Sequence, residues 1–266
     1  MNVLNQTGLK LFAGAVAVLS VSACGSDVMG SNRQAVAVSF TTNVSTAAPA
    51  SALRLSPDIT VGNTSDLVLS KIQVVLGKIE LNENDATSCV AEIEQSGDGD
   101  HGEAGHECED VKRDPILVDI PLDDAAHTVI DVPLAQGTYS KLEAKLEPAR
   151  SDATAFNTAN PNLVGKSVRV EGTFKGTPFV FTSAARSSLE MEFNPPLVID
   201  ATTTNATISL DVRKWFLDRN NAVIDPTTAT PGSDALQQIE DNIHRSFRAF
   251  EDDDRSGTDD HGDHHD

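Results

Sequence analysis

The sequence predicts a mainly β protein: an antiparallel β-sandwich, then one C-terminal amphipathic helix and a disordered acidic tail. Two observations point to the sandwich. Apolar and polar residues alternate with a period of two, and the alternating segments recur roughly every 8–12 residues without helices between them. A parallel α/β sheet would require crossover helices between its strands, so that class of fold is excluded.

The sandwich is expected to span residues 35–232. In segment 67–81 the phase of the alternation changes, because Leu67 and Leu69 fall in one phase and Ile72 in the other. This change predicts a bend or a β-bulge within one strand. The expected strands are 35–40, 67–81, 115–122, 127–134, 139–147, 167–174, 179–183, 188–193, 197–200 and 206–212.

The helix is expected over 234–250, with Ser233 in a position that suits an N-cap. Its apolar residues are three and four positions apart and form a single stripe, typical of a helix that packs on a sheet. They are Leu236, Ile239, Ile243, Phe247 and Phe250. His244 falls on the polar face and is expected at the surface. The loop before the helix, 215–226, is expected to be anchored by Trp215.

Residues 1–23 have the pattern of a secretory signal peptide. Residues 11–23 are apolar or small and uncharged. As a helix they would span about 20 Å, short of the roughly 30 Å hydrocarbon core of a membrane. A cleaved signal therefore fits this segment better than a transmembrane helix does.

The residues Val21-Ser22-Ala23-Cys24 resemble the lipobox of bacterial lipoproteins. The resemblance implies cleavage before Cys24, lipidation of its thiol and acylation of the new N-terminus, which together anchor a chain stably in a membrane. Gly25 stands where many diderm bacteria place the aspartate that retains a lipoprotein at the inner membrane, so the implied location is the outer membrane. Residues 24–34 would then be a linker. The alternative is a coincidental cysteine after an ordinary signal.

Cys89 and Cys108 remain as one pair once Cys24 carries lipid, and an oxidising compartment favours their pairing. We expect a disulfide that closes an acidic insert at 89–108 and stabilises the fold by about 3 kcal/mol. Two free buried thiols are the alternative.

The formal net charge of −20 argues against nucleic-acid binding and against attraction to anionic lipid. The insert and the tail 251–266 together hold five of the seven histidines, which favours cation binding. In the insert, His101 and His106 could bind zinc with nearby acids, although their spacing does not fit a His-Glu-x-x-His protease. A mobile acidic loop is the alternative.

The tail contains one frame that matches a calcium loop, which uses oxygen ligands at positions 1, 3, 5, 7, 9 and 12 and glycine at position 6. Counted from Asp252, position 6 is Gly257, and the helix 234–250 would lead directly into the loop. The ligands would be Asp252, Asp254, Ser256, the Thr258 carbonyl, Asp260 and Asp263. Asp259 at position 8, usually apolar, and Asp263 in place of a bidentate glutamate depart from the EF-hand pattern. Loose cation binding and a disordered solubilising tail are the alternatives.

The segments PLAQGTYSKLEAKLEP, VRVEGTF and TISLDVRKWF resemble a family of transthyretin-like β-sandwich lipoproteins of bacteria. The resemblance implies a sandwich over about 35–225. It implies no activity and no functional residues, because none is established for the family.

Taken together, these patterns predict a lipid-anchored β-sandwich binding module of the cell envelope that binds Ca²⁺ or another divalent cation and has an unknown envelope partner. A structural or protein-interaction lipoprotein with solvated acidic segments is the alternative. An envelope hydrolase is disfavoured, because the sequence contains neither a Gly-x-Ser-x-Gly motif nor a Walker loop.

Substitution Cys24→Ser should abolish lipidation, because the thiol is the acceptor of the first lipid. Intact mass spectrometry of the membrane-extracted protein should show acyl chains on the wild type and none on the variant, which should leave the membrane fraction. A variant that keeps both its acyl mass and its membrane association would refute the assignment.

Overall fold

The computed structural model describes residues 33–42, 58–83, 109–112, 115–123, 125–203 and 205–260. Cys24, Cys89, Cys108, His101, His106 and Asp263 lie outside these residues. The signal peptide, the lipid anchor, the disulfide and the zinc pair therefore stay predictions. No helix in the described part is long and apolar enough to cross a membrane.

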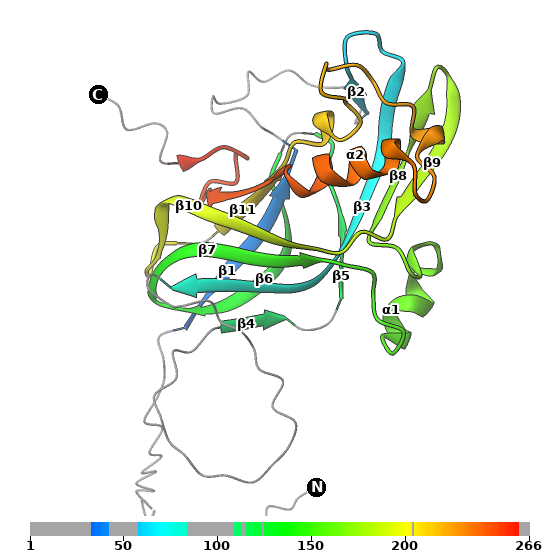
Figure 1. Ribbon diagram of the computed structural model, residues 1–266. Coiled ribbons are helices and arrows are strands. Elements are labelled where there is room, and N and C mark those ends of the chain that lie inside the picture. The colour runs from blue at the N-terminus through cyan, green and yellow to red at the C-terminus, as the bar shows by residue number, and fades with distance from the viewer. Residues whose placement is uncertain are drawn as a thin grey trace, which may run out of the picture. The chain divides into compact units, whose positions relative to one another are not determined.

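The described strands form two sheets (Figure 1). The smaller sheet has four strands in the order β12-β11-β1-β6. Their bounds are β1 (Arg33–Thr41), β6 (His127–Ala135), β11 (Asn205–Leu210) and β12 (Phe247–Glu251). β1 and β11 run parallel, whereas the other pairs of this sheet are antiparallel.

The larger sheet has the order β10-β7-β3-β8-β9, and three short strands, β2, β4 and β5, also pair with β3. Its strands are β2 (Ile59–Val61), β3 (Leu67–Glu83), β4 (Glu109–Lys112), β5 (Ile116–Asp119), β7 (Gly137–Leu146), β8 (Val168–Phe174), β9 (Thr177–Ser183) and β10 (Ser187–Ile199). All of these pairs are antiparallel. The protein is thus mainly β and sandwich-like, as the alternation predicts.

Short helices and 3₁₀ turns complete the described part. They are α1 (Thr154–Ala159), α2 (Asp234–His244) and the turns η1 (Pro161–Leu163), η2 (Val212–Lys214) and η3 (Pro226–Thr228). α2 lies near β9 (Figure 1), where the Ser183 hydroxyl donates a hydrogen bond to the Glu240 carboxylate.

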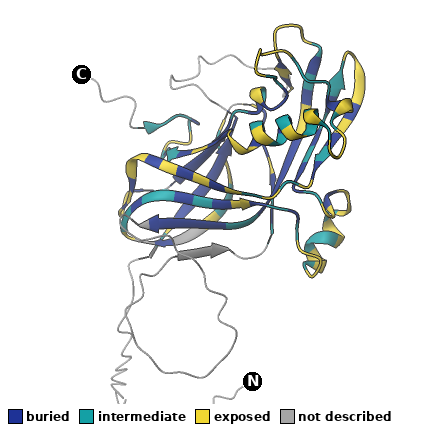
Figure 2. Ribbon diagram, viewed as in Figure 1, coloured by how far each residue is buried: buried dark blue, intermediate teal, exposed yellow. Residues whose placement is uncertain are grey.

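One hydrophobic core draws residues from both sheets and from α2. In Figure 2 buried residues alternate with exposed or half-buried ones along strands such as β9 and β10, whereas α1 has no buried residue. Trp215, Tyr139 and Phe40 are the largest fully buried side chains. Trp215 follows η2 and its indole Nε1 donates to the Ser246 hydroxyl at 2.8 Å, so the predicted anchor of this loop is buried.

The predicted bulge is present in β3. The register between β3 and β8 shifts between Leu69 and Lys71, and this shift places Ile72 in the core after Leu69 although the two are three residues apart. An extra residue in one strand moves every later side chain to the opposite face, which explains the change of phase.

The C-terminal helix is shorter than expected. Ser233 caps α2 as predicted, because its hydroxyl accepts from the Leu236 backbone N–H at 3.1 Å, and Ile239 and Ile243 are buried. The helix ends at His244, and Phe247 begins β12 instead of continuing the stripe. The residues FRAFE also alternate with a period of two, and as a strand they satisfy the backbone groups of β11. Residues 247–251 fit both a helical stripe and the alternation of a strand, and pairing with β11 makes them a strand.

Gly172→Ala should destabilise the fold by about 1–3 kcal/mol. Gly172 in β8 pairs with Leu69 at the bulge, and a Cβ atom there would collide with the backbone carbonyl oxygen of Val68, which cannot rotate away. Equilibrium urea unfolding measures the loss. Val180→Ala is the control, because Val180 on β9 is 57% exposed and its truncation should change stability by no more than about 0.5 kcal/mol. Equal stability of Gly172→Ala and the wild type would contradict this packing.

Candidate metal centre

The acidic segment after β12 is a folded loop over residues 252–260, and the prediction of a disordered tail is wrong for these residues. β12 delivers the chain to the loop: the Asp252 N–H donates to the Asn205 carbonyl oxygen at 3.5 Å, directly after the last pair of the β11–β12 ladder. The expected entry from a helix is therefore corrected to entry from a strand.

Two residues with left-handed backbone conformation turn the loop. Arg255 has φ 56° and Gly257 has φ 78°. The Gly257 N–H points into the loop and donates to the Asp252 carboxylate at 3.1 Å. The Ser256 N–H donates in the same way to Asp254 Oδ1 at 2.8 Å. Gly257 thus makes the sharp turn that a glycine at position 6 of the predicted frame requires.

Asp252 is fully buried, at 0% exposure. Its Oδ2 accepts hydrogen bonds from the Thr207 hydroxyl at 2.8 Å and from the Gly257 N–H. Its Oδ1 is also buried and has no hydrogen-bond partner among the described residues. A buried carboxylate oxygen without a partner is costly, because nothing replaces the water it has lost. This oxygen needs a proton or a cation.

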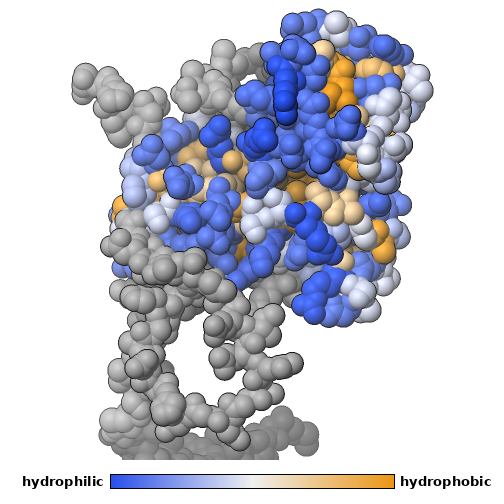
Figure 3. Space-filling model, viewed as in Figure 1, coloured by the Kyte–Doolittle hydropathy of each residue, from blue (hydrophilic) through white to orange (hydrophobic). Residues whose placement is uncertain are grey.

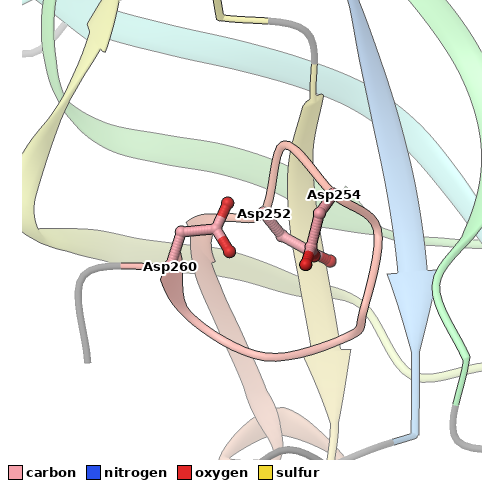
Figure 4. Close-up of side chains that lie close together, drawn as sticks. All are labelled: Asp252, Asp254 and Asp260. Carbon is pink, nitrogen blue, oxygen red and sulfur yellow. The ribbon is translucent and has the colours of Figure 1, made fainter. Parts of the chain in front are cut away.

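Asp254 and Asp260 lie beside Asp252. One carboxylate oxygen from each of the three residues lies within 4.8 Å of the other two. Figure 4 shows Asp260 reaching towards the other two carboxyl groups from the far end of the loop. Asp260 is held in place because its Oδ2 accepts from the Asp253 N–H at 2.7 Å. These three are positions 1, 3 and 9 of the predicted calcium frame.

Asn205, at the start of β11, fastens the loop to the sheet. Its side-chain amide donates to the Asp252 carbonyl oxygen at 2.7 Å and to the Thr207 hydroxyl at 2.8 Å. Its backbone N–H donates to Asp253 Oδ1 at 3.1 Å, and its Oδ1 accepts from the Ser39 hydroxyl of β1 at 2.5 Å. The buried polar side chains under the loop therefore form a network that crosses from β12 to β1.

No motif in the sequence singles out Asn205, Thr207 or Ser39 as part of the site. They occupy the positions in β11 and β1 that alternate with the apolar core residues, a pattern that normally marks a solvent-facing side of a strand. All three are nevertheless buried. The only available signal was the small size and polarity of this row, which is equally typical of an exposed strand.

Burial raises the pKa of the Asp252 carboxyl to about 6, although the hydrogen bonds from Thr207 and Gly257 act to lower it. Burial also raises the pKa of Asp260, and the neighbouring charges of Asp254 and Asp253 add to that shift. Asp254 behaves oppositely: hydrogen bonds from the backbone and side chain of Ser256 lower its pKa. The site thus combines a carboxylate held ionised with two that resist ionisation, a combination that a bound cation would relieve.

The remaining predicted ligands are only partly described. The Ser256 and Thr258 hydroxyls lie 2.6 Å apart and hydrogen-bond to each other. Asp263 lies outside the described residues, as does the proposed zinc pair His101 and His106.

A serine–histidine contact occurs away from the loop. His244, which is on the surface as predicted, places Nδ1 2.5 Å from the Ser187 hydroxyl. Among the described residues, no hydrogen bond joins a carboxylate to this imidazole to orient it. An exposed pair of this kind does not form the nucleophile, base and orienting group of a hydrolytic site.

On the face of the described residues that Figure 3 shows, no broad apolar patch competes with the loop as a site. The face in Figure 3 is mainly hydrophilic, with hydrophobic residues in small separate areas. Of the large exposed hydrophobic residues of the described part, Val164 follows η1, Val180 lies on β9 and Val198 lies on β10. Isolated exposed residues of this kind are normal on protein surfaces.

The geometry defines a sandwich-like β protein with a buried-aspartate loop at the C-terminal edge of its smaller sheet. No protein-family model, curated protein or solved structure matches the chain. The loop itself therefore carries the functional argument.

In protein freed of divalent cations, the free energy of unfolding should fall as the pH rises from about 4 to about 6. The unfolded chain ionises Asp252 near 3.8, whereas the folded protein must ionise it against a pKa of about 6, so the folded state loses stability across this window. Asp260 contributes in the same direction.

The ionisation of Asp252 should account for a loss of about 1–3 kcal/mol in the free energy of unfolding across this pH window. Asp252→Asn should remove that part of the loss. Urea unfolding in chelator at several pH values measures it for the variant and the wild type. Two curves that decline in parallel would contradict the burial of an ionisable Asp252.

Proposed function

We propose that this protein is a lipid-anchored β-sandwich module of the bacterial cell envelope that binds a calcium ion in the loop 252–260. The observation that carries the proposal is the buried and unpartnered Asp252 Oδ1 beside two further carboxylates. A cation at this point supplies the missing partner and offsets the repulsion among the three aspartates.

The ligand chemistry favours calcium. The three clustered side chains offer only oxygen atoms, which hard cations such as calcium and magnesium prefer, whereas zinc sites use mainly histidine and cysteine. Calcium tolerates irregular coordination, whereas magnesium demands a near-ideal octahedron. A loop closed by Gly257, with carboxylates at positions 1, 3 and 9, suits the more tolerant ion.

The architecture differs from an EF-hand. A strand leads into the loop, and the loop packs on β11 through Asn205 and Thr207 instead of joining two helices. Ion binding in this setting fixes the loop against a sheet. We therefore assign the site to the weak range of extracellular calcium modules, with a Kd of about 10⁻⁴–10⁻³ M.

The envelope location rests on the lipobox at Cys24. An acylated Cys24 would hold the protein on the membrane by lipid alone, since a net charge of −20 gives no electrostatic attraction to anionic headgroups. The partner on the membrane side is therefore the lipid bilayer itself, and any protein partner would meet the sandwich.

Isothermal titration with calcium tests the site, with the mature chain carrying Cys24→Ser so that it is free of lipid. Asp254→Asn should weaken calcium binding at least about tenfold, because affinity in such loops follows the number of ligand charges. Asp254 is the suitable ligand to change because it is exposed and its replacement should not disturb folding.

Asp259→Asn is the matched control. It removes one charge from the same loop at position 8 of the frame, which supplies no ligand, and should reduce binding only slightly. Equal loss in both variants would show general attraction to acid instead of a defined site. If titration of the wild type with calcium produces no heat of binding, the proposed function is refuted.

A further inference from the structure

β12 is a five-residue strand at the edge of its sheet, and it is held there from one side. Its ladder with β11 runs from the pair formed by Ala206 and Glu251 to the pair formed by Leu210 and Phe247. On its other side lies β10, the edge strand of the larger sheet, and no ladder joins the two strands in the described part. A cleft of about 940 Å³ is lined by both strands and also by Gly257 and Asp259 of the loop.

The N-terminal end of β12 is fastened by groups that carry no charge. The Ser246 hydroxyl accepts from Trp215 Nε1 at 2.8 Å and donates to the Ile243 carbonyl oxygen at 2.7 Å. Phe247 and Ala249 are buried against the core. None of these contacts depends on a cation or on ionisation.

The C-terminal end of β12 is fastened by the acidic loop. Besides the backbone bond from the Asp252 N–H to the Asn205 carbonyl oxygen, three hydrogen bonds that use side chains join the loop to β11: from Thr207 to the Asp252 carboxylate, from the Asn205 amide to the Asp252 carbonyl, and from the Asn205 N–H to Asp253. Every one of them requires Asp252 and Asp253 to stay where they crowd against Asp254 and Asp260. Without a cation, mutual repulsion of these carboxylates works directly against this attachment.

We infer that the ion bound by the loop is a latch on β12, meaning that it controls whether the C-terminal half of this edge strand stays paired with β11. The inference rests on the proposed calcium site and adds a role for it. With the ion bound, both ends of β12 are fixed. Without it, the strand frays from Glu251 back towards Ala249, while the end at Phe247 stays attached.

The latch also links calcium to the cleft between β10 and β12. Phe250 and Arg248 of β12 line that cleft together with Gly257. Fraying of β12 removes one wall of the cleft and leaves the edge of β11 without its neighbour. An unpaired strand edge is a surface on which another extended chain can pair. Calcium therefore keeps this edge of the sheet closed.

Hydrogen–deuterium exchange of the full mature chain, with Cys24→Ser, tests the latch. Peptides that cover β11 and β12 should exchange at least about tenfold faster in chelator than in millimolar calcium, a local change of about 1.4 kcal/mol. Peptides that cover β7 and β8 should not change. Asp254→Asn lacks one ligand and also one of the repelling charges, so calcium should change the exchange of β12 much less in this variant than in the wild type. In Asp259→Asn, β12 should respond to calcium as the wild type does.

Thr207→Val separates the latch from ion binding. It keeps all three carboxylates and removes the side-chain bond from β11 to Asp252. Calcium should still bind, as calorimetry would show, but should protect β12 less than in the wild type.

The outcomes distinguish the two ideas. If calorimetry detects no calcium binding to the wild type, the proposed function fails and the latch fails with it. If calcium binds but exchange in β12 is unchanged, or if all strands slow equally, the latch is overturned while the calcium site stands.

Discussion

The burial of the Asp252 carboxyl group against β11 is the interaction on which the C-terminal end of this protein depends. Thr207 and Gly257 satisfy one carboxylate oxygen, and the other is left buried among carboxylates. That arrangement fixes the turn of the loop, the position of Asp254 and Asp260, and the end of β12. It is also the source of the raised pKa, because the same burial that orders the loop opposes ionisation. The burial of Asp252 therefore accounts both for the order of the loop and for the raised pKa of its carboxyl group.

The site is assembled from parts of the chain that are far apart in sequence. Asn205 receives a hydrogen bond from Ser39, accepts one from the Asp252 N–H through its backbone carbonyl and donates one to the Asp252 carbonyl oxygen through its side-chain amide. β11 can play this role because it lies between β1 and β12 in the smaller sheet. The loop thus acquires its shape from a sheet that must already be in place as well as from the hydrogen bonds among its own residues. This dependence explains how a run rich in aspartate, which is typical of disordered segments, becomes an ordered loop.

Local patterns in the sequence predicted what local geometry determines. The phase change after Leu69 revealed the bulge in β3, and the frame that begins at Asp252 placed Gly257 at the turn. Sequence patterns gave the wrong structure where pairing between strands far apart in the chain determines the conformation. Phe247 and Phe250 fit a helical stripe, and only the free edge of β11 makes them a strand. Asn205 and Thr207 carry no signal of burial, because nothing in β11 itself shows that a loop from residue 252 onwards will cover it. The parallel pairing of β1 with β11 joins segments that are equally remote.

The place of β1 in the sheet has a mechanical consequence. The chain enters the sandwich through a central strand, paired with β11 on one side and with β6 on the other. A pull along β1 from its N-terminal end would load both of its hydrogen-bond ladders in shear at the same time. An edge strand such as β12 would instead be peeled away one bond after another. Under such a pull, two ladders would hold β1, whereas an edge strand is held by one.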